Sequence, residues 1–197
     1  MLTRELRTFV VQGKYPQLLL DLWDAWDRER KSQSIRPDRF PSNQAYAILV
    51  LPNLGTDLES FTFRPATAWS QACAVFFQTL TALASAERAA RFEHRDLHWG
   101  QIMLQRTPVP RAGVAAGTKL DSEMFGVRAT IIDMGLSRMQ WGGREGGEPV
   151  WTAFEECIFE GKGDYQFDIY RMMKAHIGQG QAWKEFRPLT NLMVRLC

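Results

Sequence analysis

Residues 92–101, FEHRDLHWGQ in one-letter code, place a carboxylate and a carboxamide five positions apart in one short segment. A carboxylate can accept the proton of a hydroxyl group, and a nearby side-chain oxygen can hold a metal ion that carries phosphate groups. Asp96 is the candidate base, and Gln101 is the candidate metal ligand. The segment therefore indicates phosphotransfer chemistry built on a single turn.

A second carboxylate follows a predicted strand. Residues 127–132 are rich in β-branched and apolar side chains, which predicts a strand with an apolar end, and they run directly into Asp133. Kinase-type sites grip their cation with an Asp-x-Gly carboxylate in this position. Residues 102–104 predict another short strand, so a hairpin of the two strands would bring Asp96, Gln101 and Asp133 together.

Each motif also has a plainer interpretation. A His-Arg-Asp triplet alone fits a surface turn or an ion pair, and Asp-x-Gly after a strand fits an ordinary turn. Both motifs occur here in the expected order in one chain. Their combination favours phosphotransfer over two unrelated turns.

Two longer segments narrow the match. Residues 91–100 (RFEHRDLHWG) and 163–171 (GDYQFDIYR) closely resemble the two most distinctive segments of the haspin family of atypical protein serine/threonine kinases. The resemblance extends to residues 11–16 (VQGKYP) and 55–59 (GTDLE), and it covers nearly the whole chain. It implies an α+β, protein-kinase-like fold with a mainly helical C-lobe and short β-hairpins. It also implies ATP and Mg²⁺ as cofactors, and transfer of the γ-phosphate to a threonine near the start of the histone three tail.

The resemblance implies roles for individual positions of the loop. Asp96 would accept the threonine hydroxyl proton, and Asp133 would chelate the cation that bridges the β- and γ-phosphates. His98 stands where many kinases carry lysine. The catalytic set that follows is Asp96, His98 and Arg95, and the metal set is Gln101 and Asp133.

A nucleotide site is implied where the strand predicted at residues 46–51 ends at a proline. Proline lacks an N–H, yet its carbonyl group can still accept a hydrogen bond from an adenine, and Leu54 can donate one. Without the resemblance, an ordinary strand end with a turn explains the segment equally well. The expected cofactor-binding residues are Pro52, Leu54, Asp57, Met103 and Ile132.

Four more residues complete the implied site. His94 and Asp168 are expected to support the loop, Asp168 by accepting hydrogen bonds from its backbone N–H groups. Glu155 and Glu156 stand where the family has an acidic stretch that faces a basic peptide substrate. Taken alone, these two glutamates fit an ordinary solvated surface.

Other segments predict the elements that carry the site. Residues 16–30 have helical periodicity, and we expect Trp23 and Trp26 to anchor the core. Residues 46–51 predict a buried strand, residues 105–125 an irregular insert and residues 142–147 a flexible loop. Thr67 is a candidate cap for a long helix that would carry the catalytic loop. The expected apolar face of that helix is Trp69, Cys73, Phe76, Leu80 and Leu83.

The expected organisation is a remnant of an N-lobe over residues 1–51, a hinge at 52–57 and a C-lobe over 58–197 that is incomplete at its C-terminus. The sequence offers no Gly-x-Gly-x-x-Gly loop and no strand lysine to grip phosphates. Gln101 also stands where the family has asparagine. We therefore expect a truncated kinase domain with most of the N-lobe missing, whose activity alone is in question.

Two other functions stay open. A pseudokinase or peptide-binding module without catalysis fits Gln101 and the missing lysine. A small-molecule phosphotransferase of the aminoglycoside-kinase type also uses an Asp-Leu-His block, but Trp99 and residues 164–171 favour the haspin resemblance.

Composition bounds these possibilities. Of the 197 residues, 45% are hydrophobic, which is enough to form a core. The net charge of +2 does not indicate a basic surface that would bind nucleic acid. The three cysteines form no CxxC pair, which suggests a reduced compartment, and no apolar run suits a membrane span or a signal peptide. We expect an intracellular monomer that binds neither nucleic acid nor membrane. The resemblance adds a histone tail as the basic peptide partner and a nuclear or chromosomal location.

Overall fold

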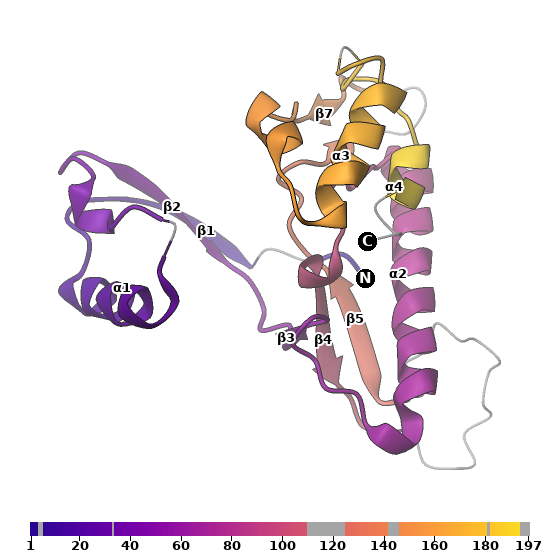
Figure 1. Ribbon diagram of the computed structural model, residues 1–197, viewed down its shortest axis with the longest axis horizontal. Coiled ribbons are helices and arrows are strands. Elements are labelled where there is room, and N and C mark those ends of the chain that lie inside the picture. Colours follow the sequence, from indigo (N-terminus) through magenta and orange to yellow (C-terminus); the bar gives the residue numbers. More distant parts are fainter. Residues whose placement is uncertain (4–5, 33, 110–124, 142–145, 181, 194–197) are drawn as a thin grey trace. The chain divides into compact units, whose positions relative to one another are not determined.

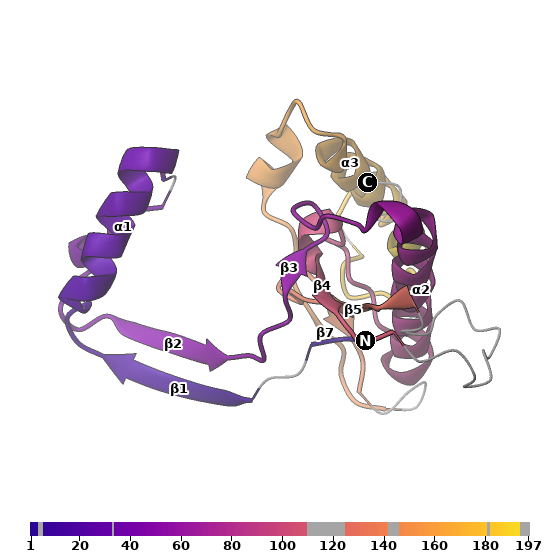
Figure 2. The same ribbon diagram turned by 90° about the horizontal axis from the view of Figure 1, so that it is seen from below.

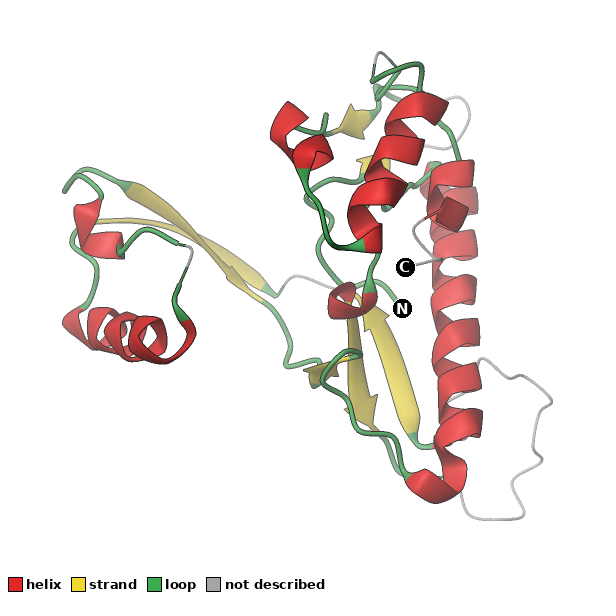
Figure 3. Ribbon diagram, viewed as in Figure 1, coloured by secondary structure: helices red, strands yellow, loops and turns green. Residues whose placement is uncertain are grey.

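The computed structural model describes residues 1–3, 6–32, 34–109, 125–141, 146–180 and 182–193. The chain divides into two compact units, of which one is Arg4–Pro52 and the other combines Met1–Thr3 with Asn53–Cys197 (Figure 1). Helices and short antiparallel strands are mixed, as a kinase-like domain requires (Figure 3). Among the described residues, no helix is both long and apolar enough to cross a membrane.

The Arg4–Pro52 unit is a two-stranded sheet with one helix. Strand β1 (Arg7–Gln12) pairs antiparallel with β2 (Ala45–Val50), and helix α1 (Gln17–Arg30) lies between them in the chain. Pro16 precedes the first turn of α1, and Lys31 ends the helix in the left-handed conformation. The helix predicted at residues 16–30 and the strand predicted at 46–51 are thus confirmed to within a residue.

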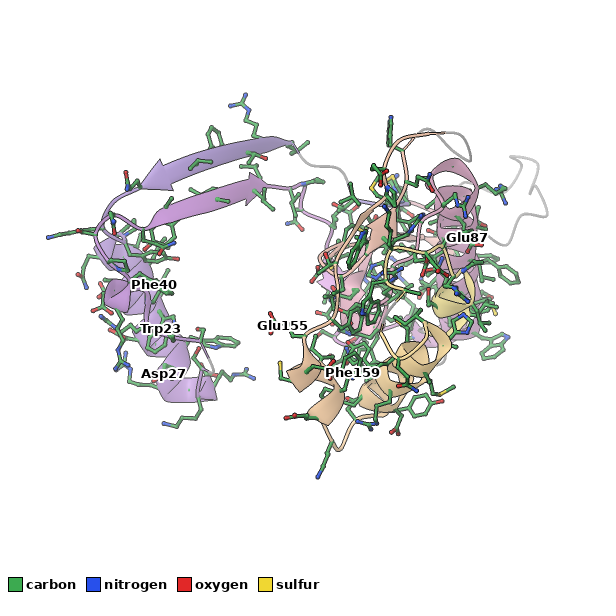
Figure 4. The ribbon with its side chains drawn as sticks, turned by 90° about the horizontal axis from the view of Figure 1, so that it is seen from above. Trp23, Asp27, Phe40, Glu87, Glu155 and Phe159 are labelled. Carbon is green, nitrogen blue, oxygen red and sulfur yellow. The ribbon has the colours of Figure 1, made fainter. Side chains whose placement is uncertain are left out.

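Burial in this unit differs from the prediction. Among the described residues of α1, Leu20 is the buried one, and Trp26 is 57% exposed. Strand β2 is exposed at all but one position. The predictions of core tryptophans and of a buried strand are therefore wrong, because one helix and two strands bury little area within the unit. Figure 4 labels Trp23, whose indole Nε1 donates a hydrogen bond to Ser34 Oγ at 3.2 Å.

The other unit contains a three-stranded antiparallel sheet in the order β3 (Thr56–Asp57), β4 (Ile102–Arg106) and β5 (Val127–Ile131). The two predicted strands and their hairpin are confirmed, with Ile102 opposite Ile131. Gly55 enters β3 with a φ of +86°, and a Cβ there would lie 2.2 Å from the carbonyl oxygen of Leu104. Only glycine fits this close approach of the backbone at position 55 to β4.

Helix α2 (Ala68–Ala90) lies along this sheet and leads to the loop of residues 91–98 (Figure 2). The predicted apolar face is confirmed at Leu83, which is fully buried, but not at Trp69 and Phe76, which are 82% and 54% exposed. The side chain of Gln78 is buried instead, where Nε2 donates to Val127 O at 3.0 Å and Oε1 accepts from Ala129 N at 2.8 Å. Gln78 turns inward beside the buried apolar side chains of Ala74 and Val75 because the outer edge of β5 needs partners for its backbone groups.

Residues 1–3 complete that edge. The backbone N–H of Ile131 donates to Met1 O at 2.8 Å, and Thr3 N donates to Ile131 O at 2.9 Å. This parallel pairing places residues 1–3 with the sheet, whereas the sequence suggested that they belong with residues 4–51.

The C-terminal part of this unit packs on the other half of α2. It contains β6 (Arg138–Met139) paired with β7 (Val150–Trp151), followed by α3 (Tyr165–His176) and α4 (Leu189–Met193). Part of the predicted insert, residues 110–124, and part of the predicted flexible loop, residues 142–145, lie outside the described residues. The main buried core consists of Leu83, Phe92, Leu97, Ile131, Phe154, Ile169, Tyr170, Met173, Ile177 and Trp183.

Candidate active site

The loop of residues 91–98, which carries the candidate base Asp96, begins where α2 ends. Arg91 closes the helix with a φ of 45°, and Arg95 also adopts a left-handed backbone with a φ of 69°. The chain then turns through a short 3₁₀ segment at Trp99–Gln101 into β4. Two left-handed residues within five positions bend the loop back over the core.

His94 joins this loop to the strand that precedes Asp133. Its buried ring makes a hydrogen bond of 3.0 Å from Nε2 to the carbonyl oxygen of Ile132, and its Nδ1 accepts the backbone N–H of Asp96 at 3.4 Å. Burial lowers the pKa of His94 below its usual value. A neutral ring supplies the one donor and the one acceptor that these contacts need.

Asp133 and Gln101 meet at this junction. Asp133 is exposed at a φ of 59°, and its Oδ1 accepts the backbone N–H of Gly135 at 3.0 Å. Its Oδ2 accepts a hydrogen bond of 3.3 Å from Nε2 of Gln101. The structure therefore brings the two predicted metal ligands together.

The donor set suits a magnesium ion. A carboxylate and an amide that can turn its oxygen outward are hard oxygen ligands, and Mg²⁺ usually takes one or two carboxylates and completes its shell with phosphates and water. Among the described residues, no group of three or more His, Cys, Asp or Glu side chains gathers into a cage. Asp133 and Gln101 are therefore the described residues that could hold such an ion.

Asp96 is held by two residues of α3 that sequence reasoning missed. Its Oδ1 accepts hydrogen bonds from the hydroxyl of Tyr170 and from Nε2 of Gln166, the latter at 3.2 Å. Asp164 caps α3 by accepting the backbone N–H of Gln166 at 2.8 Å. The spacing of four between Gln166 and Tyr170 places both on one helix face, which was the available signal.

Asp168 lies on the opposite face of α3. It is exposed and forms an ion pair of 2.6 Å with Arg171, and among the described residues it makes no hydrogen bond with the loop of residues 91–98. Two positions along a helix rotate a side chain by roughly 200° from Gln166. The expectation that Asp168 supports the loop is therefore wrong. The residues of α3 that contact the loop are Gln166 and Tyr170, which bond to the carboxylate of Asp96.

Arg95 is fully buried beneath the loop. Its Nε lies 3.1 Å from Glu93 Oε2, its Nη2 donates to Trp183 O at 2.9 Å, and its guanidinium lies over the Trp183 ring. A side chain in this position cannot touch a reacting group. The structure therefore corrects its place in the catalytic set, and Arg95 is a residue that positions the loop.

Three further partners of the loop come from distant sequence. The carboxylate of Glu93 accepts the backbone N–H of Arg187 at 2.7 Å and the hydroxyl of Thr190 at 2.8 Å. Asn191 accepts the backbone N–H of His94 at 2.9 Å. No local pattern could have linked residues almost a hundred positions apart.

His98 borders the space beside the loop. Its Nδ1 accepts the backbone N–H of Gly100 at 3.1 Å, and a Cβ at Gly100 would lie 2.8 Å from its ring. A cavity of about 300 Å³ opens here. Its lining residues are His98, Trp99, Gly163, Asp164, Tyr165 and Gln166.

The residues predicted to bind the nucleotide are spread over both units. Leu54 is buried, and Asp57 of β3 pairs with Met103 of β4. Asp57 accepts the backbone N–H of Ser60 at 2.8 Å, and this hydrogen bond lowers the pKa of its carboxyl group. Pro52 belongs to the Arg4–Pro52 unit, so the hinge contact with an adenine stays a prediction.

Glu155 and Glu156 are both exposed, and Figure 4 labels Glu155. Glu156 forms an ion pair of 2.6 Å with Lys174, whereas Glu155 accepts a long contact of 3.7 Å from the thiol of Cys157. Glu155 is thus the less neutralised of the two carboxylates.

The chain is similar to proteins of one family. A family model described as a haspin-like kinase domain matches residues 2–195. The chain is 34% identical to the serine/threonine-protein kinase haspin homolog hrk1 of Schizosaccharomyces pombe and 36% identical to the serine/threonine-protein kinase haspin of Mus musculus, with 93% of the chain covered in each case. It is 38% identical to the haspin homolog of Arabidopsis thaliana over 83% of its length. The matches span 40%, 24% and 27% of these relatives, respectively.

Proposed function

Because the chain belongs to the haspin-like kinase domain family, we propose that it transfers the γ-phosphate of ATP to a serine or threonine hydroxyl of a protein. One observation carries the proposal. The hydrogen bond between His94 and Ile132 fastens the loop that bears Asp96 to the strand end that bears Asp133. A candidate base and a candidate metal ligand are thereby fixed on one rigid junction.

In this mechanism Asp96 accepts the proton of the substrate hydroxyl as the oxygen attacks. Asp133 and Gln101 would hold the divalent metal. ATP and that metal, when bound, supply the phosphoryl group and neutralise its charge. The protein contributes position, through the buried contacts of His94 and Arg95 that keep the loop in one conformation.

The proposed substrate is a basic peptide such as the histone three tail, with a threonine near its start as the acceptor. Exposed carboxylates at Glu155 and Asp164 support a basic partner on this unit. The names of the relatives support a protein substrate for the family. A nuclear or chromosomal location and a monomeric state belong to the same proposal.

A second candidate is a module that binds its peptide without catalysis. The observation that favours it is the hydrogen bond from Gln101 to Asp133, because it occupies an oxygen that the metal would need. The two candidates differ in whether phosphate reaches the peptide.

The test is to incubate the chain with Mg-ATP and a peptide of the histone three amino terminus, and to detect product by mass spectrometry. The matched control peptide carries valine in place of the threonine. Phosphate on the threonine peptide alone supports the kinase. Peptide binding by titration calorimetry without transfer supports the second candidate, and neither binding nor transfer contradicts both.

A further inference from the structure

Two donors bond to the same oxygen of Asp96, which suggests that the two oxygens of its carboxylate have different roles. We propose that Tyr170 and Gln166 are positioning residues that hold Oδ1 of Asp96, and so leave Oδ2 as the oxygen that accepts the substrate proton. The proposal rests on the proposed phosphotransfer, and it adds which oxygen acts and what orients it.

The donors fit together as a closed set. The amide of Gln166 has two N–H bonds, of which one is directed to the Tyr170 hydroxyl oxygen and the other to Asp96 Oδ1 at 3.2 Å. The Tyr170 hydroxyl then has its own proton for the same Oδ1. Every polar hydrogen in the set has an acceptor, which makes the arrangement cooperative.

The donors are also rigid. Tyr170 is 5% exposed, and its ring packs edge-on against Phe154, with centroids 5.3 Å apart. Gln166 is fixed through its backbone N–H, which the Asp164 side chain caps. The donors therefore stay in place when a substrate enters, and do not have to be ordered at the moment of reaction.

The other oxygen of Asp96, Oδ2, is available to accept a proton. Among the described residues, Oδ2 of Asp96 receives no hydrogen bond from another side chain or from the backbone. Gln166 also lines the cavity of about 300 Å³ beside His98 and Trp99, which has room for a hydroxyl-bearing side chain. The same amide thus orients the base and borders the space in which an acceptor would lie.

The first test is the kinetics of Tyr170→Phe, which removes one hydroxyl and keeps the buried ring. We expect kcat for peptide phosphorylation to fall about tenfold, the scale of one hydrogen bond to a charged group, with KM for ATP unchanged. Tyr46→Phe, the same chemical change in the Arg4–Pro52 unit, is the matched control. A normal kcat in Tyr170→Phe, or an equal loss in Tyr46→Phe, overturns the proposal.

The role of Gln166 is tested by comparing a neutral with a negatively charged replacement. Gln166→Leu removes the donor, while Gln166→Glu keeps the size and places a second negative charge against Asp96. We expect the glutamate variant to lose more of kcat than the leucine variant. Gln17→Leu is the control, because Gln17 donates to Asp21 at 2.8 Å on an exposed helix. Equal losses in the two Gln166 variants contradict an orienting hydrogen bond.

A readout without catalysis separates this proposal from the proposed function. Carbodiimide and glycine ethyl ester label carboxyl groups, and peptide mapping gives the rate at Asp96. We expect Tyr170→Phe to raise that rate about fivefold, as loss of one hydrogen bond implies, and Tyr46→Phe to leave it unchanged. If the chain transfers no phosphate but the labelling rises, the function fails and the positioning contact stands. Equal labelling in Tyr170→Phe and the unchanged chain overturns the contact.

Discussion

His94 shows how one buried side chain organises the candidate site. Its ring holds the backbone of Asp96 on one side and the strand end before Asp133 on the other. Burial makes the neutral ring the stable form, which is also the form that these two contacts need.

This burial predicts a pH dependence of stability. The pKa of His94 is lowered in the folded chain, so below the ordinary histidine pKa of about 6.5 the unfolded chain binds a proton that the folded chain does not. The stabilisation is complete above that pH and is lost as the pH falls toward the folded pKa. We expect urea unfolding to show a smaller loss of stability between pH 7.5 and 5.5 in His94→Gln than in the unchanged chain. Equal losses in the two proteins would show that another group causes the fall in stability at low pH.

Gln101 gives a second prediction at this scale. Its longer side chain reaches Asp133 at 3.3 Å through the amide nitrogen, where a metal needs oxygen. Gln101→Asn shortens the side chain, and we expect the phosphotransfer rate to rise by up to about a hundredfold, the cost of a misplacement near one ångström. Gln12→Asn, on an exposed strand, is the control in the same assay. No gain in Gln101→Asn would show that Gln101 does not limit the rate.

At the scale of elements, the edge of β5 explains why α2 buries polar side chains. Strand β4 covers one edge of β5, while Gln78 and residues 1–3 satisfy backbone groups on the other. Burying a strand edge is possible only when its N–H and C=O groups find partners. Helix α2 therefore supplies hydrogen-bond partners to the edge of β5, as a neighbouring strand would, and also packs apolar side chains against the sheet.

Gln78→Leu tests this role. The replacement keeps the volume of the side chain. It leaves the N–H of Ala129 and the C=O of Val127, both on the buried strand β5, without a hydrogen-bond partner. Two unsatisfied buried groups are expected to cost about 2–4 kcal/mol of unfolding free energy, measured by urea denaturation. Gln17→Leu, whose amide is exposed, should leave the stability nearly unchanged, and a similar loss in both variants would refute the edge account.

The elements also show where sequence reasoning succeeded. Strands β4 and β5 were predictable because their apolar runs are local, and so was α1 from its 3.6-residue period. The buried face of α2 was not, because its glutamines are buried only for a strand edge that lies about fifty positions away. Asn191 and Thr190 were missed for the same reason, since their partners are the loop residues His94 and Glu93.

At the scale of the whole molecule, segments that are far apart in the sequence meet at one junction. The backbone at the end of β5 accepts a hydrogen bond from the ring of His94, and side chains of helices α3 and α4 bond to Asp96 and His94. Such convergence favours a catalytic site, because a surface turn needs no support from three separate elements. The family relationship supports the proposed phosphotransfer.

Transfer of phosphate by the chain and by Asp96→Asn is the most direct measurement of this account. Asparagine keeps the size and the hydrogen-bond geometry of Asp96 but cannot accept the hydroxyl proton. We predict that Asp96→Asn loses at least about a hundredfold in rate, the lower scale of general base catalysis, while its melting temperature and that of the control Asp38→Asn stay near that of the unchanged chain. Unchanged transfer in a folded Asp96→Asn would show that Asp96 is not the base, and would contradict the account.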